Sequence, residues 1–246
     1  MTMKEFLDRK LYPGLSGHWD DALFRERILD FIRPDSVVLD IGAGAGIVDE
    51  MNFKGLARRV VGIDPDSRVL TNPYLDEAHI GTGEDLPFED GTFDVVFADN
   101  VMEHLDAPEV VFAEIWRVLK PGGIFLGKTP NKNHYMPLIA RITPHSFHGW
   151  VNRLRGRAVV DTFPTRYRIN TAKAVRSLAR TIGFDTLFID HVEARPEYLR
   201  ITPPTYIAGW LYERLVNSTD ALERFRILLI AALRKPGAAN EDRAGA

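Results

Sequence analysis

The stretch that most constrains the fold of this chain is VVLDIGAGAGIV, residues 37–48. Apolar residues of strand length run directly into a loop with glycine at the alternate positions Gly42, Gly44 and Gly46. Glycine lets the backbone turn sharply and lets a ligand approach main-chain N–H groups that side chains would cover. The stretch therefore predicts a buried strand that ends in a ligand-binding loop.

Strand-length apolar runs alternate with helix-length periodic segments along the rest of the chain. We expect strands over residues 37–41, 59–63, 78–81, 93–98, 123–128, 184–192 and 225–233, and helices over 108–119, 171–181 and 205–217. This alternation is typical of a mostly parallel sheet covered by helices. It predicts an α/β fold of the doubly wound, Rossmann-like kind.

Length and composition indicate one domain. The 246 residues are 45% hydrophobic and 26% charged, which is enough to bury a substantial core. We place the domain over residues 1–236 and expect the small, polar residues 237–246 to be a disordered tail. No apolar run approaches a membrane span and the first residues do not read as a signal peptide, so the expected location is cytoplasmic.

Two classes of chemistry are disfavoured by residue counts. The chain has no cysteine, which excludes disulfides, thiolate metal sites and a cysteine nucleophile. Its formal net charge of −3 argues against nonspecific nucleic-acid binding, which needs a basic surface.

The residues around the glycines distinguish between two kinds of cofactor-binding loop. A dinucleotide fold would have the pattern G-x-G-x-x-G, but Ile47 stands where its third glycine belongs. This disfavours an NAD-dependent dehydrogenase. The pattern D-x-G-x-G-x-G, starting at Asp40, resembles motif I of class I S-adenosylmethionine-dependent methyltransferases. The resemblance implies that Asp40 lies near the cationic amino end of the cofactor and that the backbone of Gly42, Ala43, Gly44 and Gly46 lines its site.

The second expected strand, VVGID, ends on Asp64 and is followed by Pro65. An acidic group at this position accepts hydrogen bonds from both hydroxyls of a ribose. The alternative is a helix-capping aspartate, because Asp followed by Pro is a common helix start.

A third stretch, IGTGEDLPFEDGTFDVVFADNVMEHL, also resembles the methyltransferase family. In the commonest family version an aspartate stands at the position of Thr82 and contacts the adenine amino group. Because this chain lacks that carboxylate, Gly83 and Glu84 become the nearest candidates for the adenine contact. Asn100 falls where the family's chain passes the methionine part of the cofactor. With the LKPGG turn, the resemblance covers residues 35–130.

The resemblance implies a seven-stranded sheet that is mostly parallel with an antiparallel last strand. It also implies S-adenosylmethionine at the carboxyl ends of the first strands and an acceptor over the fourth and fifth. The reaction is then an in-line methyl transfer, which needs alignment and exclusion of water, to oxygen or nitrogen of a small or carrier-linked acceptor. A non-catalytic, cofactor-binding regulatory protein is the alternative.

Residues 129–170 are a long connection after the fifth expected strand and predict a lid over the acceptor. A general base is needed only for an acceptor that must lose a proton. His134, close to the strand end, and His104, in the EHL string, are the two candidates. His145 and His148 are expected to pack within the lid rather than bind a metal, because acidic ligands are nearly absent around them.

The same region is basic. Its cations are Lys128, Lys132, Arg141, Arg153, Arg155, Arg157, Arg166 and Arg168, against the single acid Asp161. This predicts an anionic acceptor, unless these residues pair with acids elsewhere. Residues 205–217 are expected to pack on the sheet, with a membrane surface or a dimer contact as alternatives, and the oligomeric state stays open. An N-terminal helix with His18, Trp19 and Phe24 is expected to cover the cofactor.

Overall fold

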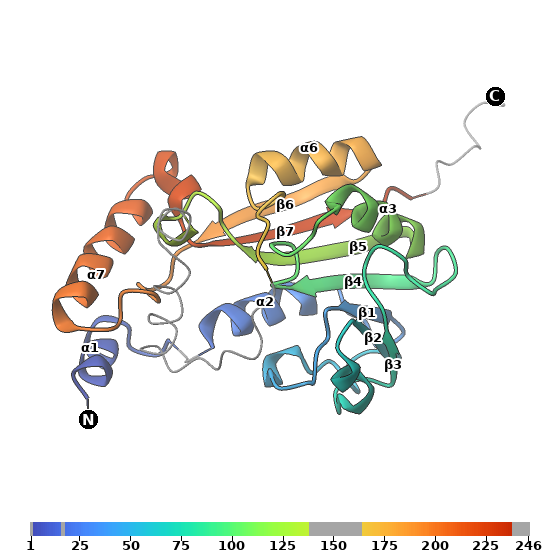
Figure 1. The fold of residues 1–246 in the computed structure, drawn as a ribbon, viewed down its shortest axis with the longest axis horizontal. Coiled ribbons are helices and arrows are strands. Elements are labelled where there is room, and N and C mark those ends of the chain that lie inside the picture. The colour runs from blue at the N-terminus through green and yellow to red at the C-terminus, as the bar shows by residue number, and fades with distance from the viewer. Residues whose placement is uncertain (1, 16–17, 138–163, 238–246) are drawn as a thin grey trace.

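One seven-stranded sheet organises the molecule (Figure 1). The computed structural model describes residues 2–15, 18–137 and 164–237. The strands are β1 (Val37–Ile41), β2 (Arg59–Asp64), β3 (Glu77–Ile80), β4 (Phe93–Asp99), β5 (Leu119–Pro130), β6 (Asp185–Val192) and β7 (Leu228–Arg234). They lie in the order β3-β2-β1-β4-β5-β7-β6.

Strand directions confirm the expected mixed sheet. β1 pairs in parallel with β2 and β4, while β7 runs antiparallel to both β5 and β6. All five residues of β1 are buried, as expected for a central strand whose two faces are both covered. The apolar composition of VVLDI is explained by this position.

Helices cover both faces of the sheet (Figure 1). α2 (Trp19–Leu29) covers one face, and α3 (Pro108–Val118) and α6 (Ala172–Ile182) cover the other. α1 (Met3–Leu11) and α7 (Pro203–Asn217) lie beyond one end of the sheet (Figure 1). The 3-10 turns are η1 (Asp49–Met51), η2 (Ser67–Thr71) and η4 (Asp220–Phe225). Ile115 of α3 and Val175 of α6 belong to one buried apolar cluster, and Phe24 and Ile28 of α2 belong to a second. The sheet separates these two clusters, so the core has two layers.

The expected boundaries differ from the structure mainly near turns. The strand expected over 225–233 begins instead at Leu228, because the residues before it wind into η4. The helix expected over 108–119 ends at Val118, and β5 already begins at Leu119. Gly122 has a φ of 84°, in the left-handed region, so it allows the KPGG turn to be absorbed into the start of this long strand.

The α7 helix has one buried face and an exposed apolar stripe. Tyr206, Gly209, Glu213 and Val216 are buried, whereas Ile207, Leu211 and Leu215 are 44%, 57% and 58% exposed. The expected packing on the sheet differs from the structure, because the buried face lies against the N-terminal helix and η4: the Tyr206 hydroxyl donates to Asp8 at 2.6 Å and the Tyr212 hydroxyl to the Phe225 carbonyl at 2.6 Å. Contact of the exposed stripe with a membrane surface or a second copy stays a prediction. Within the described ranges, no helix is long and apolar enough to cross a membrane.

The strand order also fixes where a ligand can bind. From β1 the chain winds outward through β2 to β3, and then returns to place β4 on the other side of β1. Ligands of open α/β sheets bind beyond the strand carboxyl ends at such a switch point. Asp40 of β1 pairs with Phe97 of β4, so the ends of these two strands open onto the same crevice.

Candidate functional site

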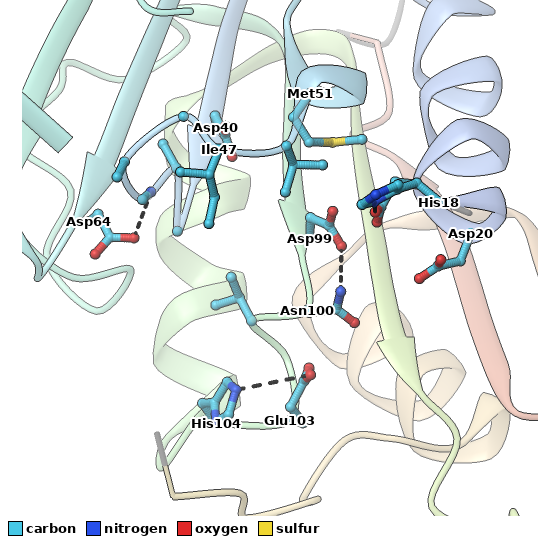
Figure 2. A pocket seen from close by; sticks show the side chains of 18 of the residues that line it. His18, Asp20, Asp40, Ile47, Met51, Asp64, Asp99, Asn100, Glu103 and His104 are labelled. Atoms are coloured by element: carbon cyan, nitrogen blue, oxygen red, sulfur yellow. Dashed lines mark hydrogen bonds and ion pairs between the residues drawn. The ribbon is translucent and has the colours of Figure 1, made fainter. Parts of the chain in front are cut away.

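A pocket of about 790 Å³ lies at this crevice (Figure 2). Its walls come from the loops after β1, β2 and β4, from the start of α2 and from segments near residues 167, 198 and 228. The sequence-predicted residues that line it are Asp40, Gly42, Ala43, Gly44, Gly46, Asp64, Pro65, Asn100 and His104. The structure therefore brings together most of the predicted cofactor site.

The glycine loop is held open toward the pocket. Gly42, Gly44 and Gly46 all have φ between 52° and 80°, in the left-handed region that glycine tolerates and other residues rarely adopt. The Asn72 amide donates to the carbonyls of Ala43 at 2.9 Å and Gly44 at 3.3 Å. The Asn72 side chain, directly after η2, thus clamps the loop in place.

Two glycines of this loop, Gly44 and Gly46, predict different stability losses. Gly44→Ala and Gly46→Ala share the cost of a left-handed residue, about 1 kcal/mol. A Cβ at Gly44 meets no protein atom within 4 Å, but one at Gly46 overlaps the Asn72 side chain and lies 2.8 Å from Cδ of Pro73. We expect Gly46→Ala to lose about 3 kcal/mol in urea unfolding, because overpacking adds to the strain, and Gly44→Ala only about 1 kcal/mol. Equal losses would contradict the clamp.

Asp64 is anchored at the end of β2 with its carboxylate at the pocket. Oδ2 accepts a hydrogen bond from the Gly44 N–H at 2.9 Å, and Oδ1 accepts one from the Asp66 N–H at 2.7 Å. Each oxygen keeps further acceptor capacity for a ligand. The helix-capping role belongs to Asp66, whose side chain accepts from the Arg68 N–H at the start of η2. This removes the alternative weighed for Asp64.

Two further carboxylates, Asp40 near the end of β1 and Asp99 at the end of β4, line the pocket. Burial raises the pKa of Asp40 well above its ordinary value, and the nearby Asp99 and Asp64 raise it further. Burial raises the pKa of Asp99 to about 7, although Lys128 opposes the shift. A cationic ligand in the pocket would stabilise the ionised form of both groups.

Lys128 is buried beneath the pocket and joins three elements. Its Nζ lies 2.9 Å from Oδ1 of Asp99 and 3.4 Å from Oδ2 of Asp20, and it also pairs with Asp21. Burial alone would lower the pKa of Lys128, but these carboxylates raise it above its usual range. The residue thus ties the start of α2 to the ends of β4 and β5.

Glu103 and His104 lie at another end of the pocket (Figure 2). The Glu103 side chain is buried, and its Oε2 accepts from the Thr129 hydroxyl at 2.8 Å. His104 Nδ1 lies 3.1 Å from the Pro164 carbonyl and Nε2 lies 4.0 Å from Oε1 of Glu103. The sequence analysis quoted the EHL string but gave Glu103 no role, although the signal for it was in that string.

His134 does not lie at the pocket, in contrast to its expected place near the reacting groups. It is fully buried among Tyr135, Tyr198 and Tyr212, and burial lowers its pKa to about 3. Its Nδ1 accepts from the Met136 N–H at 3.3 Å, so Nε2 carries the proton and faces Glu193 at 3.4 Å. A neutral histidine enclosed in the core has no path to an acceptor, so the geometry leaves His104 as the base candidate.

Acid should destabilise the protein through His134. A histidine with a folded pKa below its unfolded value binds fewer protons in the folded state, so stability is full above pH 6.5 and falls as the pH drops toward 3. At pH 5 the expected loss is about 2 kcal/mol. Urea unfolding of His134→Phe should lack this component, whereas Tyr135→Phe in the same cluster should keep it. Parallel pH profiles for the wild type and His134→Phe would refute the assignment.

Some residues that were expected to contact the cofactor line the pocket, and others do not. Gly83 and Glu84, proposed for the adenine, are not among the pocket-lining residues, and a Cβ at Gly83 would lie 3.0 Å from Val111. His18 and Trp19 do line the pocket, but Phe24 is fully buried against Phe97. Phe24 therefore belongs to the core and does not cover the pocket.

Several lining residues were not singled out by the sequence analysis, among them Glu197 and Tyr198, and Tyr167 belongs to the connection that was expected to form a lid. Tyr167, Glu197 and Tyr198 reach the pocket from segments far along the chain. The Tyr167 N–H donates to the Glu103 carbonyl at 3.1 Å, and Tyr167 has a φ of 51°. No local motif marks these positions, because only the fold brings them to the strand ends.

The basic region after β5 is largely paired where it is described. Arg166 lies 2.9 Å and Arg168 lies 3.8 Å from Oδ1 of Asp106, and Lys128 is neutralised as above. Arg141, Arg153, Arg155 and Arg157, as well as His145 and His148, lie outside the described residues. The alternative of paired basic residues therefore holds for Lys128, Arg166 and Arg168.

One group of possible metal ligands occurs in the described part of the chain. Side-chain atoms of His18, Asp21 and Glu50 lie within 4.8 Å of one another. Asp21 already pairs with Lys128, so this group competes with a buried ion pair for its carboxylate.

Comparison with known proteins agrees with this architecture. Residues 39–127 match the family model of a methyltransferase domain. A probable S-adenosylmethionine-dependent methyltransferase of Mycolicibacterium smegmatis is 34% identical over 162 residues, which cover 63% of this chain and 55% of that protein. The chain thus spans about half the length of this curated relative.

Two solved structures share the fold at low sequence identity. The [4+2]-cyclase SpnF has a TM-score of 0.57 at 19% identity, covering 88% of this chain and 82% of its own. Geranyl diphosphate C-methyltransferase from Streptomyces coelicolor, solved with S-adenosylhomocysteine, has a TM-score of 0.55 at 16% identity, covering 88% of this chain and 77% of its own. A fold shared with a cyclase does not fix the reaction.

Proposed function

We propose that this chain, which combines a seven-stranded α/β fold with a match to a methyltransferase domain, is a class I S-adenosylmethionine-dependent methyltransferase that transfers the cofactor's methyl group to oxygen or nitrogen of a small or carrier-linked acceptor. The observation that carries the proposal is the convergence of the glycine loop, Asp40 and Asp64 on one pocket at the strand ends.

The chain's own residues fit this cofactor. Asp64 offers two carboxylate oxygens to the ribose hydroxyls, and Gly44 leaves open space for close approach of the ligand to the backbone. Asp40 is a buried carboxylate flanked by Asp99 and Asp64, an arrangement that favours the positive charges of the methionine part. The cofactor, when bound, supplies a methyl group already activated by its sulfonium.

The protein's part in the reaction is alignment. The acceptor would occupy the end of the pocket lined by Glu103, His104, Tyr167 and Tyr198. A hydroxyl acceptor would also need a proton acceptor, and of the two pocket-lining histidines, His18 and His104, the one at this end is His104.

Methyl-labelled S-adenosylmethionine tests turnover. We expect the full chain, incubated with labelled cofactor and a metabolite extract, to release S-adenosylhomocysteine in equal amount to the label that appears in an extractable product. Tight cofactor binding without label transfer across extracts would favour the alternative, a non-catalytic cofactor-binding protein. A chain denatured by heat is the control for spontaneous methylation.

A further inference from the structure

The pocket wall is strongly acidic. Its described carboxylates are Asp20, Asp21, Asp40, Asp64, Asp66, Asp99, Glu103 and Glu197. Arg68 is the single lysine or arginine among the described lining residues. A pocket of this charge repels an anionic acceptor and attracts a cationic one.

Most of these acids have an identifiable counter-charge. Asp66 pairs with Arg68 at 2.7 Å, and Glu197 pairs with Arg195 at 2.6 Å. Lys128 forms ion pairs with Asp20, Asp21 and Asp99. Asp40 and Asp64 would face the cationic cofactor under the proposed function. Glu103 is the remaining lining carboxylate, to which these assignments give no lysine, arginine or cofactor charge.

Glu103 is placed to meet an acceptor. It is only 5% exposed, and its Oε2 is occupied by the Thr129 hydroxyl. Among described residues, the partner of Oε1 within ion-pair distance is His104 Nε2, at 4.0 Å, which is charged only when protonated. Figure 2 places Glu103 and His104 beyond Asn100, away from Asp40. A buried carboxylate in this position gains from a cationic N–H donor.

Two tyrosines, Tyr167 and Tyr198, line the pocket with Glu103. The hydrogen bond from the Tyr167 N–H to the Glu103 carbonyl holds Tyr167 beside Glu103, and Tyr198 lines the same pocket. Aromatic faces attract ammonium groups, by about 0.5–2 kcal/mol per contact. A carboxylate combined with tyrosines is therefore a recognition site for an amine rather than for a phosphate or carboxylate.

We propose that this end of the pocket binds an acceptor bearing a protonated amine, with Glu103 receiving its N–H and Tyr167 and Tyr198 forming the aromatic wall, and that the methylated atom is this nitrogen. The inference rests on the proposed function and narrows its acceptor class.

The transfer step is balanced in charge and atoms. The bound ammonium first gives one proton to Glu103, and burial raises the pKa of this carboxyl group, so the transfer is less uphill than to an exposed glutamate. The nitrogen lone pair then attacks the methyl carbon. The carbon–sulfur bond breaks with its electron pair moving to sulfur, which becomes a neutral thioether. The product is a methylated ammonium, and Glu103 returns its proton to solvent.

Three probes of one shape test the charge preference: benzylammonium, benzyl alcohol and benzoate. Each is titrated by calorimetry into the full chain saturated with S-adenosylhomocysteine. We expect benzylammonium to bind at least about ten-fold more tightly than the other two. Glu103→Gln should remove this preference, whereas Glu109→Gln, on the exposed surface of α3, should keep it.

Three results would overturn the inference: benzoate or benzyl alcohol binding as tightly as benzylammonium, none of the three binding, or the preference surviving in Glu103→Gln. The comparison in the unaltered chain stands even where Glu103→Gln does not fold. Failure of the chain to bind S-adenosylhomocysteine at the start would instead count against the proposed function. The two failures are therefore distinguishable.

Discussion

Asp64→Ala is expected to weaken binding of S-adenosylhomocysteine by about 100-fold or more. Two charge-assisted hydrogen bonds to a ribose are worth about 1.5–3 kcal/mol each, and the alanine removes both. Asp64→Asn keeps one acceptor oxygen and should show an intermediate loss. Isothermal titration calorimetry of the three proteins at one pH and salt concentration measures the series.

Asp35→Asn is the matched control for this series, because the Asp35 side chain is 85% exposed in the loop before β1. It should bind the ligand as the wild type does. Asp64 also holds the N–H groups of Gly44 and Asp66, so thermal unfolding of each variant must confirm a folded chain. Unchanged affinity in a folded Asp64→Ala variant would refute the ribose role.

Lys128→Met should be the most destabilising single change at the site, by about 3–5 kcal/mol. The methionine fills a similar volume but leaves Asp20, Asp21 and Asp99 without their shared counter-charge. Lys120→Met is the comparison, since Lys120 is 40% exposed and pairs with Asp94 at 2.8 Å. An ion pair this exposed is worth less than about 1 kcal/mol. Urea unfolding at pH 7 measures both losses.

The loss in Lys128→Met should also depend on pH. The pKa of Asp99 is already raised to about 7, and it rises further without the lysine. A carboxyl group with a raised folded pKa is most favourable to stability at low pH, and this contribution is lost as the pH rises through the folded pKa. The loss should therefore be smaller at pH 5 than at pH 8. Equal losses for the two lysine variants, or a loss independent of pH, would contradict the buried network.

Local patterns predicted the parts of the fold that depend on neighbouring residues. The strand over 37–41 has the same bounds in the structure, because a fully buried central strand is uniformly apolar. The glycine loop was predictable for a different local reason, because a tight turn requires glycine whatever surrounds it. The antiparallel direction of β7 came from the family resemblance rather than from its own sequence.

Contacts between distant segments were beyond local reasoning. Lys128 looks like one more cation of a basic region, and only the fold brings Asp20 and Asp21 to it across more than 100 residues. His134 stands next to a strand end, but tyrosines from distant segments, Tyr198 and Tyr212, enclose it. Charge and burial in these cases are properties of the tertiary packing, which a single sequence does not display.

Calorimetric titration of the full chain with S-adenosylmethionine, S-adenosylhomocysteine and NAD tests the central claim most directly. We predict one site per chain for both sulfur ligands and no binding of NAD, because Ile47 replaces the glycine that a dinucleotide loop requires. Binding of NAD without either sulfur ligand would contradict the assignment of this pocket.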